Sequence, residues 1–256
     1  MRRLAHPDDR IATSNSSSAA RLGATVDGID EDCDGTIDCV VGTDEVDRRR
    51  TWAADAEGMA ERGSVGCARA MHECLLAAYP EKEALWLQAC ELEKRHGSRD
   101  TLLALLRRAV AAVPTAVVLW LMAAKECWLR GDVPAARETL ETAFAANPNS
   151  EAVWLAAAKV EWESGEVDRA RALLLRARTR APTDRVWLKS AILEREVGNT
   201  EEEARLLMDG CARFPHAWKL WAMLSQMYDR AGRSDMAAEA IAAGFQQCPS
   251  SITLWR

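Results

Sequence analysis

Residues 118–154 read VLWLMAAKECWLRGDVPAARETLETAFAANPNSEAVW, and this stretch decides the fold. It contains two apolar-rich segments, 118–130 and 133–147, each long enough for about three to four helical turns. Gly131 separates the segments, and glycine enters a left-handed turn after a helix without steric cost. Pro148 follows the second segment, where it ends a helix because it has no amide proton to donate. The stretch therefore predicts two helices joined as a hairpin.

The hairpin recurs along the chain with a period of 34 residues. Seven tryptophans mark the period, and one interval, from Trp154 to Trp187, is 33 residues instead of 34. A glycine lies 11 residues after each of the first six, and a proline lies 28 residues after each. The phased tryptophans are Trp52, Trp86, Trp120, Trp154, Trp187, Trp221 and Trp255. A period of this length with one aromatic, one glycine and one proline is typical of stacked helix–turn–helix repeats.

We therefore expect an all-α fold, a right-handed α-solenoid of about six repeats over residues 45–256. The chain ends at Leu254-Trp255-Arg256, within the first helix of a seventh repeat. A solenoid needs a polar repeat at its end, and none is present here. The sequence therefore indicates a fragment of a longer protein or an incomplete gene model.

The phased tryptophans have two interpretations. They could be platforms on which nucleic-acid bases stack, or each could be the core residue that fills the space between a helix and its neighbours. Strict phasing beside small residues such as Ala157 and Ala158 favours the core interpretation. We predict that Trp52, Trp86, Trp120, Trp154, Trp187 and Trp221, together with Gly131 and Pro148, form the structural core of the repeats. Trp128, Trp162 and Trp218 are off-phase, and we expect partial burial or a contact role for them.

Residues 1–44 differ from the rest because Asn, Ser, Gly and Asp dominate and apolar residues are sparse. Such a composition cannot bury a core, so we expect a disordered acidic and serine-rich segment. Within it, Asp30, Asp32, Asp34 and Asp38 follow the spacing of a calcium-binding loop. The twelfth position, which should be a carboxylate, is Val41. The four aspartates remain a calcium candidate, and a solvated acidic linker is the favoured interpretation.

Composition and motifs exclude several classes of function. The formal net charge is −6, so no strong positive field favours nucleic acid as a partner. The eight cysteines include no C-x-x-C pair, so we read them as reduced, small core residues. No apolar run of about 18 residues predicts a membrane span. Catalytic and nucleotide-binding motifs are absent. We expect no enzyme, no cofactor, no small-molecule substrate, no resident metal and no membrane partner.

Two basic clusters leave one alternative open. Arg48-Arg49-Arg50 and the trio Arg176, Arg178 and Arg180 could contact RNA phosphates. A solvated helix face is the favoured interpretation because the chain is acidic overall. We expect RNA contact to be indirect or weak.

The repeats resemble two related families, the tetratricopeptide repeat and the half-a-tetratricopeptide (HAT) repeat of RNA-processing proteins. Acidic residues late in the first helix and Ala-Arg pairs early in the second are similar to HAT repeats. These residues are Glu93, Glu161 and Glu194, and Ala68-Arg69, Ala136-Arg137, Ala170-Arg171 and Ala204-Arg205. Tetratricopeptide chaperone clamps place Lys or Asn just after the aromatic position, where this chain has leucine: Leu87, Leu121, Leu155 and Leu188.

Three stretches narrow the resemblance to the pre-mRNA-processing factor 6 family, the HAT-repeat scaffold of the spliceosomal tri-snRNP. They are EVDRRRTWAADAE, residues 119–161 and RALLLRARTRAPTDRVWLKSAILE, and the resemblance covers roughly residues 40–256. It implies a nuclear splicing factor that holds other spliceosomal and snRNP proteins during tri-snRNP assembly. An adaptor in another RNA-processing complex, for 3′-end or ribosomal RNA processing, is the alternative. The sequence does not identify the partner-binding residues.

Overall fold

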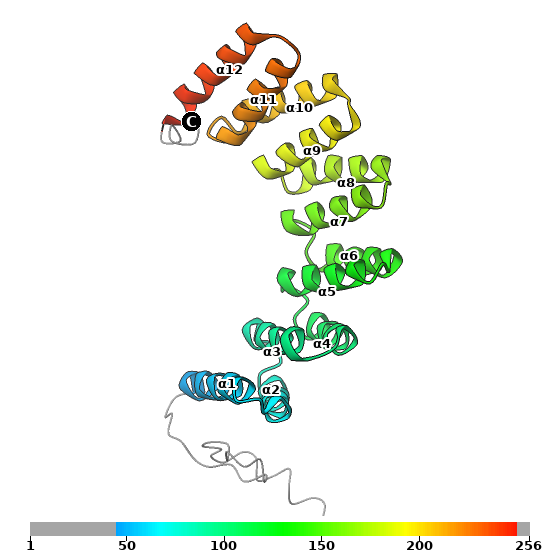
Figure 1. Cartoon of the computed structure of the whole chain (residues 1–256), viewed down its shortest axis with the longest axis vertical. Coiled ribbons are helices and arrows are strands. Elements are labelled where there is room, and N and C mark those ends of the chain that lie inside the picture. The colour runs from blue at the N-terminus through cyan, green and yellow to red at the C-terminus, as the bar shows by residue number, and fades with distance from the viewer. Residues whose placement is uncertain (1–44, 250–256) are drawn as a thin grey trace, which may run out of the picture. The chain divides into compact units, whose positions relative to one another are not determined.

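The computed structural model describes residues 45–249, and this part of the chain is helical throughout apart from short turns. The helices alternate with connections of a few residues (Figure 1). Their bounds are α1 Glu45–Glu61, α2 Val65–Ala78, α3 Glu83–His96, α4 Arg99–Ala112, α5 Val117–Leu129, α6 Val133–Ala146, α7 Glu151–Glu163, α8 Val167–Arg180, α9 Asp184–Val197, α10 Thr200–Arg213, α11 Trp218–Arg230 and α12 Ser234–Gln247. The expected all-α repeat fold is confirmed for the described residues.

The sequence-predicted hairpin of residues 118–147 corresponds to α5 and α6, with bounds that agree within one residue. Two expectations concern residues that the structure does not describe. The predicted disorder of residues 1–44 and the calcium candidate Asp30, Asp32, Asp34 and Asp38 lie outside the described range, as does Trp255.

The chain divides into two compact units, residues 1–92 and 93–256, with the boundary inside α3. In the first unit, α1 and α2 pack as a hairpin. Several buried side chains of this hairpin form one cluster with Leu92, and Trp52 is partly buried against it. The buried members of this cluster are Ala56, Met59, Ala60, Ala68, Met71 and Leu92.

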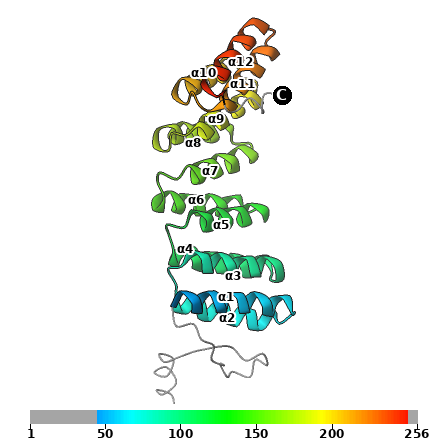
Figure 2. The same ribbon diagram turned by 90° about the vertical axis from the view of Figure 1, so that its left-hand side faces the viewer.

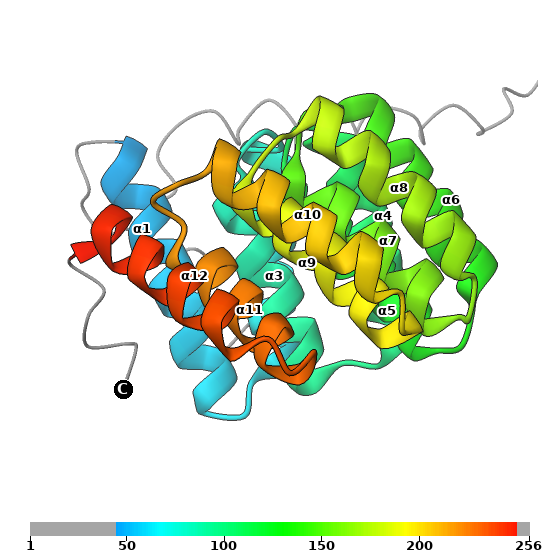
Figure 3. The ribbon, with the colours of Figure 1, turned by 90° about the horizontal axis from the view of Figure 1, so that it is seen from above.

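In the second unit, α5 pairs with α6, α7 with α8, α9 with α10, and α11 with α12 (Figure 2). The first helices of consecutive hairpins also contact one another, α5 with α7, α7 with α9 and α9 with α11. Figure 3 shows α6 and α8 beside this row of first helices, on one side of it.

Buried positions follow the repeat. Trp86, Trp120, Trp154 and Trp187 are each 9% exposed or less, whereas Trp52 and Trp221 are partly buried. Apolar residues at i, i+4 and i+7 of the second helices are also buried, for example Ala170, Leu174 and Ala177 of α8. The off-phase Trp128, Trp162 and Trp218 are half-buried, and Trp162 packs against the cluster of Ala158, Ala170, Leu174 and Leu193.

The glycine turns fall into two kinds. Gly131 has a φ of 79°, and Gly63, Gly165, Gly198 and Gly232 are also left-handed. Gly97 is not among the left-handed glycines, which departs from the sequence expectation. A side chain at Gly97 would instead clash with the Glu93 carboxylate, which accepts a hydrogen bond from Thr101 Oγ1 at 2.8 Å. Glycine is needed there for space, and at Gly131 for backbone conformation.

The prediction that the cysteines are reduced core residues is confirmed for four of those that the structure describes, and it is wrong for Cys74 in burial and for Cys67 in redox state. Cys90, Cys127, Cys211 and Cys248 are buried and free, and Cys74 is exposed and free. Burial raises the pKa of the Cys211 thiol to about 12, with a smaller contribution from Cys248, so this thiol stays protonated. Cys67 is disulfide-bonded, so the expectation that every cysteine is reduced fails there.

His72 of α2 makes the stability of the first unit depend on pH. Its side chain is buried with Nδ1 unpaired, and burial lowers its pKa below the usual 6.5, although the nearby Glu57 opposes this. Below about pH 6.5 the unfolded state binds the proton that the folded state resists, so this part of the stability is lost as the pH falls. We expect the wild-type chain to lose more stability between pH 7.5 and pH 5.5 than His72→Leu in urea unfolding. Equal losses in the two proteins would contradict this.

Candidate protein-binding surface

In four of the repeats, the phased tryptophan fixes the first helix to the preceding loop. The indole Nε1 of Trp86, Trp120, Trp154 and Trp221 donates to the carbonyl oxygen of the proline six residues earlier, at 2.7, 2.8, 2.9 and 2.9 Å. The bond is possible because the proline carbonyl is left unpaired at the end of the preceding hairpin. The proline and the tryptophan of the repeat motif therefore act as a pair, in which the proline carbonyl accepts the hydrogen bond that the indole donates.

Trp187 breaks this pattern. Pro182 lies five residues before it, so the missing residue of the 33-residue interval falls in the loop between α8 and α9. The Nε1 of Trp187 is buried and has no hydrogen-bond partner. The guanidinium groups of Arg178 and Arg213 instead lie over the indole ring, 5.1 and 5.2 Å from its centroid. These distances are within the range of cation–π contacts.

Because Trp187 lacks this hydrogen bond, equivalent substitutions at Trp154 and Trp187 should lower the free energy of unfolding by different amounts. Both Trp154→Phe and Trp187→Phe remove part of a buried ring, but only the first also removes a hydrogen bond to a proline carbonyl. We expect Trp154→Phe to lower the free energy of unfolding by about 1 kcal/mol more than Trp187→Phe. Urea unfolding followed by circular dichroism measures this difference, and a larger loss for Trp187→Phe would contradict the assignment.

Ion pairs join consecutive hairpins along the second unit. Arg137 of α6 donates from Nε and Nη2 to the two carboxylate oxygens of Glu161 in α7, both at 2.7 Å. Arg171 of α8 binds Glu194 of α9 in the same two-bonded way, at 2.8 and 2.9 Å. The hydrogen bond to the glutamate raises the pKa of each arginine, so both stay charged. The residues that resemble HAT repeats thus form bidentate bridges between repeats.

The series of bridges changes after α9. Arg205 of α10 is at the equivalent position, but the next first helix carries Tyr228 where α7 and α9 carry glutamate. Arg205 therefore pairs with Glu202 in its own helix. A reversed pair appears instead, in which Glu203 of α10 is fully buried and accepts from Arg230 Nη2 of α11 at 2.7 Å.

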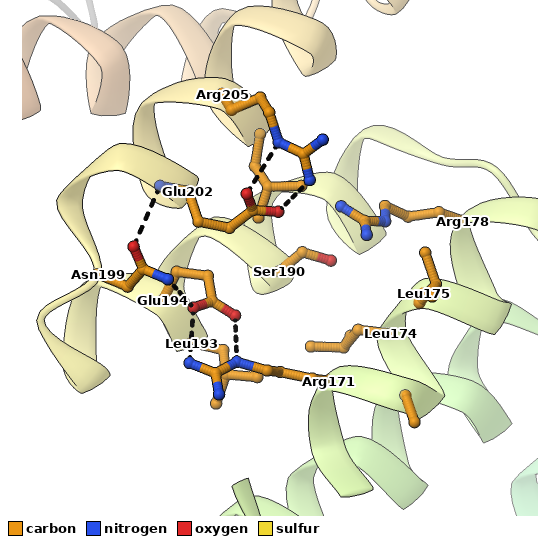
Figure 4. A pocket seen from close by; sticks show the side chains of 12 residues that line it. Arg171, Leu174, Leu175, Arg178, Ser190, Leu193, Glu194, Asn199, Glu202 and Arg205 are labelled. Carbon is orange, nitrogen blue, oxygen red and sulfur yellow. Dashed lines mark hydrogen bonds and ion pairs between the residues drawn. The ribbon is translucent and has the colours of Figure 1, made fainter. Parts of the chain in front are cut away.

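Two grooves lie between second helices of the second unit. The first, between α6 and α8 above α7, has a volume of about 310 Å³. The other, between α8 and α10 above α9, has a volume of about 350 Å³ (Figure 4). Corresponding repeat positions line both, so they are two copies of one structural feature. We call the second one the α8–α10 groove; its charged lining residues are Arg171, Arg178, Glu194, Glu202 and Arg205.

The structure separates the arginines of the predicted basic clusters. Arg178 lines the α8–α10 groove and stacks on Trp187, whereas Arg176 and Arg180 of the same helix are exposed. In α1, the Arg49 guanidinium lies 5.2 Å from the centre of the Tyr79 ring, and the side chain of Arg48 is outside the described range. The trio on α8 therefore does not form a continuous row of exposed cations.

Sequence reasoning singled out Arg178 as part of a basic cluster but missed its stacking and the groove. Two signals were available. The tryptophan interval shortens to 33 residues at this repeat, and Arg178 occupies a position that is apolar in the other repeats: Leu76, Val110, Phe144, Cys211 and Phe245. Of the leucines just after the tryptophans, Leu155 and Leu188 are half-buried against core clusters.

The described residues contain no group of three or more His, Cys, Asp or Glu side chains placed to hold a metal ion. Within the same residues, the helices fall short of the length and apolarity that crossing a membrane requires.

The helix hairpins, their phased core and the grooves between them define a tetratricopeptide-type repeat protein. In agreement with this class, residues 128–192 match the Tetratricopeptide repeat family. Over 215 residues, 84% of its length, the chain is 51% identical to the pre-mRNA-splicing factor prp1 of Schizosaccharomyces pombe. A shorter stretch of 49 residues is 46% identical to human pre-mRNA-processing factor 6. The repeat region is therefore homologous to these proteins, as its resemblance to the pre-mRNA-processing factor 6 family predicts.

The chain spans about a quarter of the length of prp1, with 24% of that protein matched. Among solved structures, the MamA protein is similar with a TM-score of 0.49 and 14% identity, covering 68% of this chain and 96% of MamA. A tetratricopeptide repeat protein from Parabacteroides merdae has the same TM-score and 16% identity, covering 79% of this chain and 80% of that one.

Proposed function

We propose that this chain is the repeat region of a nuclear pre-mRNA splicing factor and acts as a non-enzymatic scaffold for other spliceosomal proteins. The observation that carries the proposal is the 51% identity to prp1 over 215 residues. Such identity extends beyond the repeat core to surface positions, which a shared fold alone does not require. By the same relationship, the partners are snRNP proteins that come together in the tri-snRNP.

The architecture supports a binding role through its rigidity. The bidentate bridges Arg137–Glu161 and Arg171–Glu194 fix the α5–α6 hairpin to the α7–α8 hairpin and that one to the α9–α10 hairpin. A rigid stack presents many small surfaces at once, and several weak contacts then sum to tight binding. The acidic net charge of −6 favours protein partners over RNA as the direct contact.

A segment exchange tests the proposal. In fission yeast, the 215-residue segment of prp1 that aligns with this chain would be replaced by the segment from this chain. We expect a reporter intron to be removed at close to the normal level. A matched exchange carrying Trp154→Ala and Trp187→Ala serves as a control that disrupts the repeat core. Accumulation of unspliced reporter with the unaltered segment, at normal levels of nuclear chimeric protein, would contradict the proposal.

A further inference from the structure

The α8–α10 groove differs in charge from its copy in the preceding repeat. Arg178 stands where the copy has Phe144, and Leu175 stands where it has Glu141. The copy is lined by two arginines and two glutamates, whereas the α8–α10 groove is lined by three arginines and two glutamates. The groove thus carries one excess cation in a chain that is acidic overall.

Arg178 is the cation without a carboxylate. Arg171 binds Glu194 and Arg205 binds Glu202, whereas Arg178 has no ion-pair partner among residues 45–249. Figure 4 shows the same arrangement, with no dashed line reaching Arg178. Burial lowers the pKa of the Arg178 guanidinium from its usual value, although Glu202 opposes this shift. Burial therefore destabilises the charged form, and an anion placed beside it would offset that cost.

Stacking on Trp187 prepares Arg178 to bind a carboxylate. The guanidinium carbon lies 5.1 Å from the centre of the Trp187 ring, and this contact restricts the arginine side chain. The N–H groups of a guanidinium are coplanar and can donate two parallel hydrogen bonds to a carboxylate. Because the side chain is already held in place, less conformational entropy is lost on binding.

An apolar side chain accompanies the free cation. Leu175 of α8 lines the groove and is 55% exposed, the largest exposure among the large hydrophobic side chains that the structure describes. Met208 holds the equivalent position on α10 and is 47% exposed. A ligand that covered Leu175 while reaching Arg178 would gain apolar burial as well as a charge-assisted bond.

We propose that the α8–α10 groove docks an extended, acidic peptide segment of a partner protein, with a carboxylate on Arg178 and an aliphatic side chain on Leu175. RNA fits less well because Arg171 and Arg205 already use donors on glutamates, and phosphate tracking needs several free cations. Leu175 also has no role in binding a phosphate backbone. The proposal rests on the proposed function only in its premise that this repeat protein binds other proteins.

The test measures binding of a fluorescein-labelled octapeptide of alternating leucine and aspartate to the full 256-residue chain by fluorescence anisotropy. We expect saturable binding that weakens as salt increases, and at least tenfold weaker binding of the peptide with asparagine in place of aspartate. Arg178→Phe introduces the side chain that the preceding repeat carries as Phe144, so the fold is expected to tolerate it. This variant should bind the acidic peptide at least tenfold more weakly. Arg176→Gln also removes one positive charge, from an exposed site on the same helix. This variant should bind the acidic peptide as tightly as the wild type does.

A transplant tests the same residues by gain of function. Adding Glu141→Leu and Phe144→Arg to the Arg178→Phe variant should restore binding in the preceding groove. The proposal is overturned if the wild type does not bind the acidic peptide, or if Arg178→Phe binds it equally well. It is also overturned if a twelve-nucleotide oligouridylate binds in its place and Arg178→Phe abolishes that binding. Co-purification of splicing proteins with a chain that does not bind the peptide would reject this groove and leave the proposed function standing.

Discussion

Replacing Trp154 with alanine is expected to lower the free energy of unfolding by about 3–5 kcal/mol. Trp154 is 9% exposed, its ring centre lies 4.3 Å from that of Phe144, and its Nε1 donates to Pro148 at 2.9 Å. The substitution therefore opens a cavity between consecutive hairpins and removes a hydrogen bond. Each repeat is stabilised mainly by its neighbours, so the loss weakens the interface on which the stack depends.

Urea unfolding followed by far-ultraviolet circular dichroism measures this loss, because the ten tryptophans of the chain complicate fluorescence. Trp162→Ala is the control, since it removes the same side chain from a half-buried site. We expect it to cost roughly half as much, because less apolar surface is lost. Equal effects of the two substitutions would show that the phased tryptophan has no special place in the core.

Removing Arg230 is expected to cost about 3 kcal/mol, near the lower end for breaking a buried ion pair because Arg230 is itself half exposed. Its partner Glu203 is fully buried, and the second carboxylate oxygen, Oε2, already has no hydrogen-bond partner. Arg230→Ala would leave the carboxylate buried without any cation or donor. The loss of stability is again measured by urea unfolding.

Two further variants show whether the loss comes from the uncompensated charge. Arg169→Ala removes an arginine from an exposed pair with Glu166, and its expected cost is below about 1 kcal/mol. Glu203→Leu combined with Arg230→Met should recover most of the stability lost in Arg230→Ala, since apolar replacements of a buried pair are often neutral. If the double variant is no more stable than Arg230→Ala, the unpaired-charge explanation is wrong.

The periodicity of the sequence was sufficient to predict the helices, because the glycine and the proline of each repeat mark the ends of its two helices. The hairpin predicted from residues 118–147 agrees with α5 and α6 within one residue. Gly97 shows the limit of this reasoning. It occupies the glycine position of the repeat, but the Glu93 carboxylate fills the space where its side chain would be, and this contact depends on packing.

The surface was harder to predict than the core. Arg137 and Glu161 were each singled out as repeat features, yet their pairing across 24 residues depends on how one hairpin stacks on the next. Arg178 was read as part of a basic cluster, and its contact with Trp187 followed only from the structure. A comparison of each position across all repeats would have identified it, because a cation there is unlike the apolar residues of the other repeats.

In the proposed function, this repeat region holds splicing proteins by direct protein contact. The most direct test is to purify the tagged full chain from nuclear extract, with and without RNase, and to identify the recovered proteins by mass spectrometry. We expect recovery of tri-snRNP proteins that is unchanged by RNase and reduced by Trp154→Ala. Loss of these proteins on RNase treatment would mean that RNA carries the association. Recovery of 3′-end or ribosomal RNA processing factors in their place would contradict the splicing assignment.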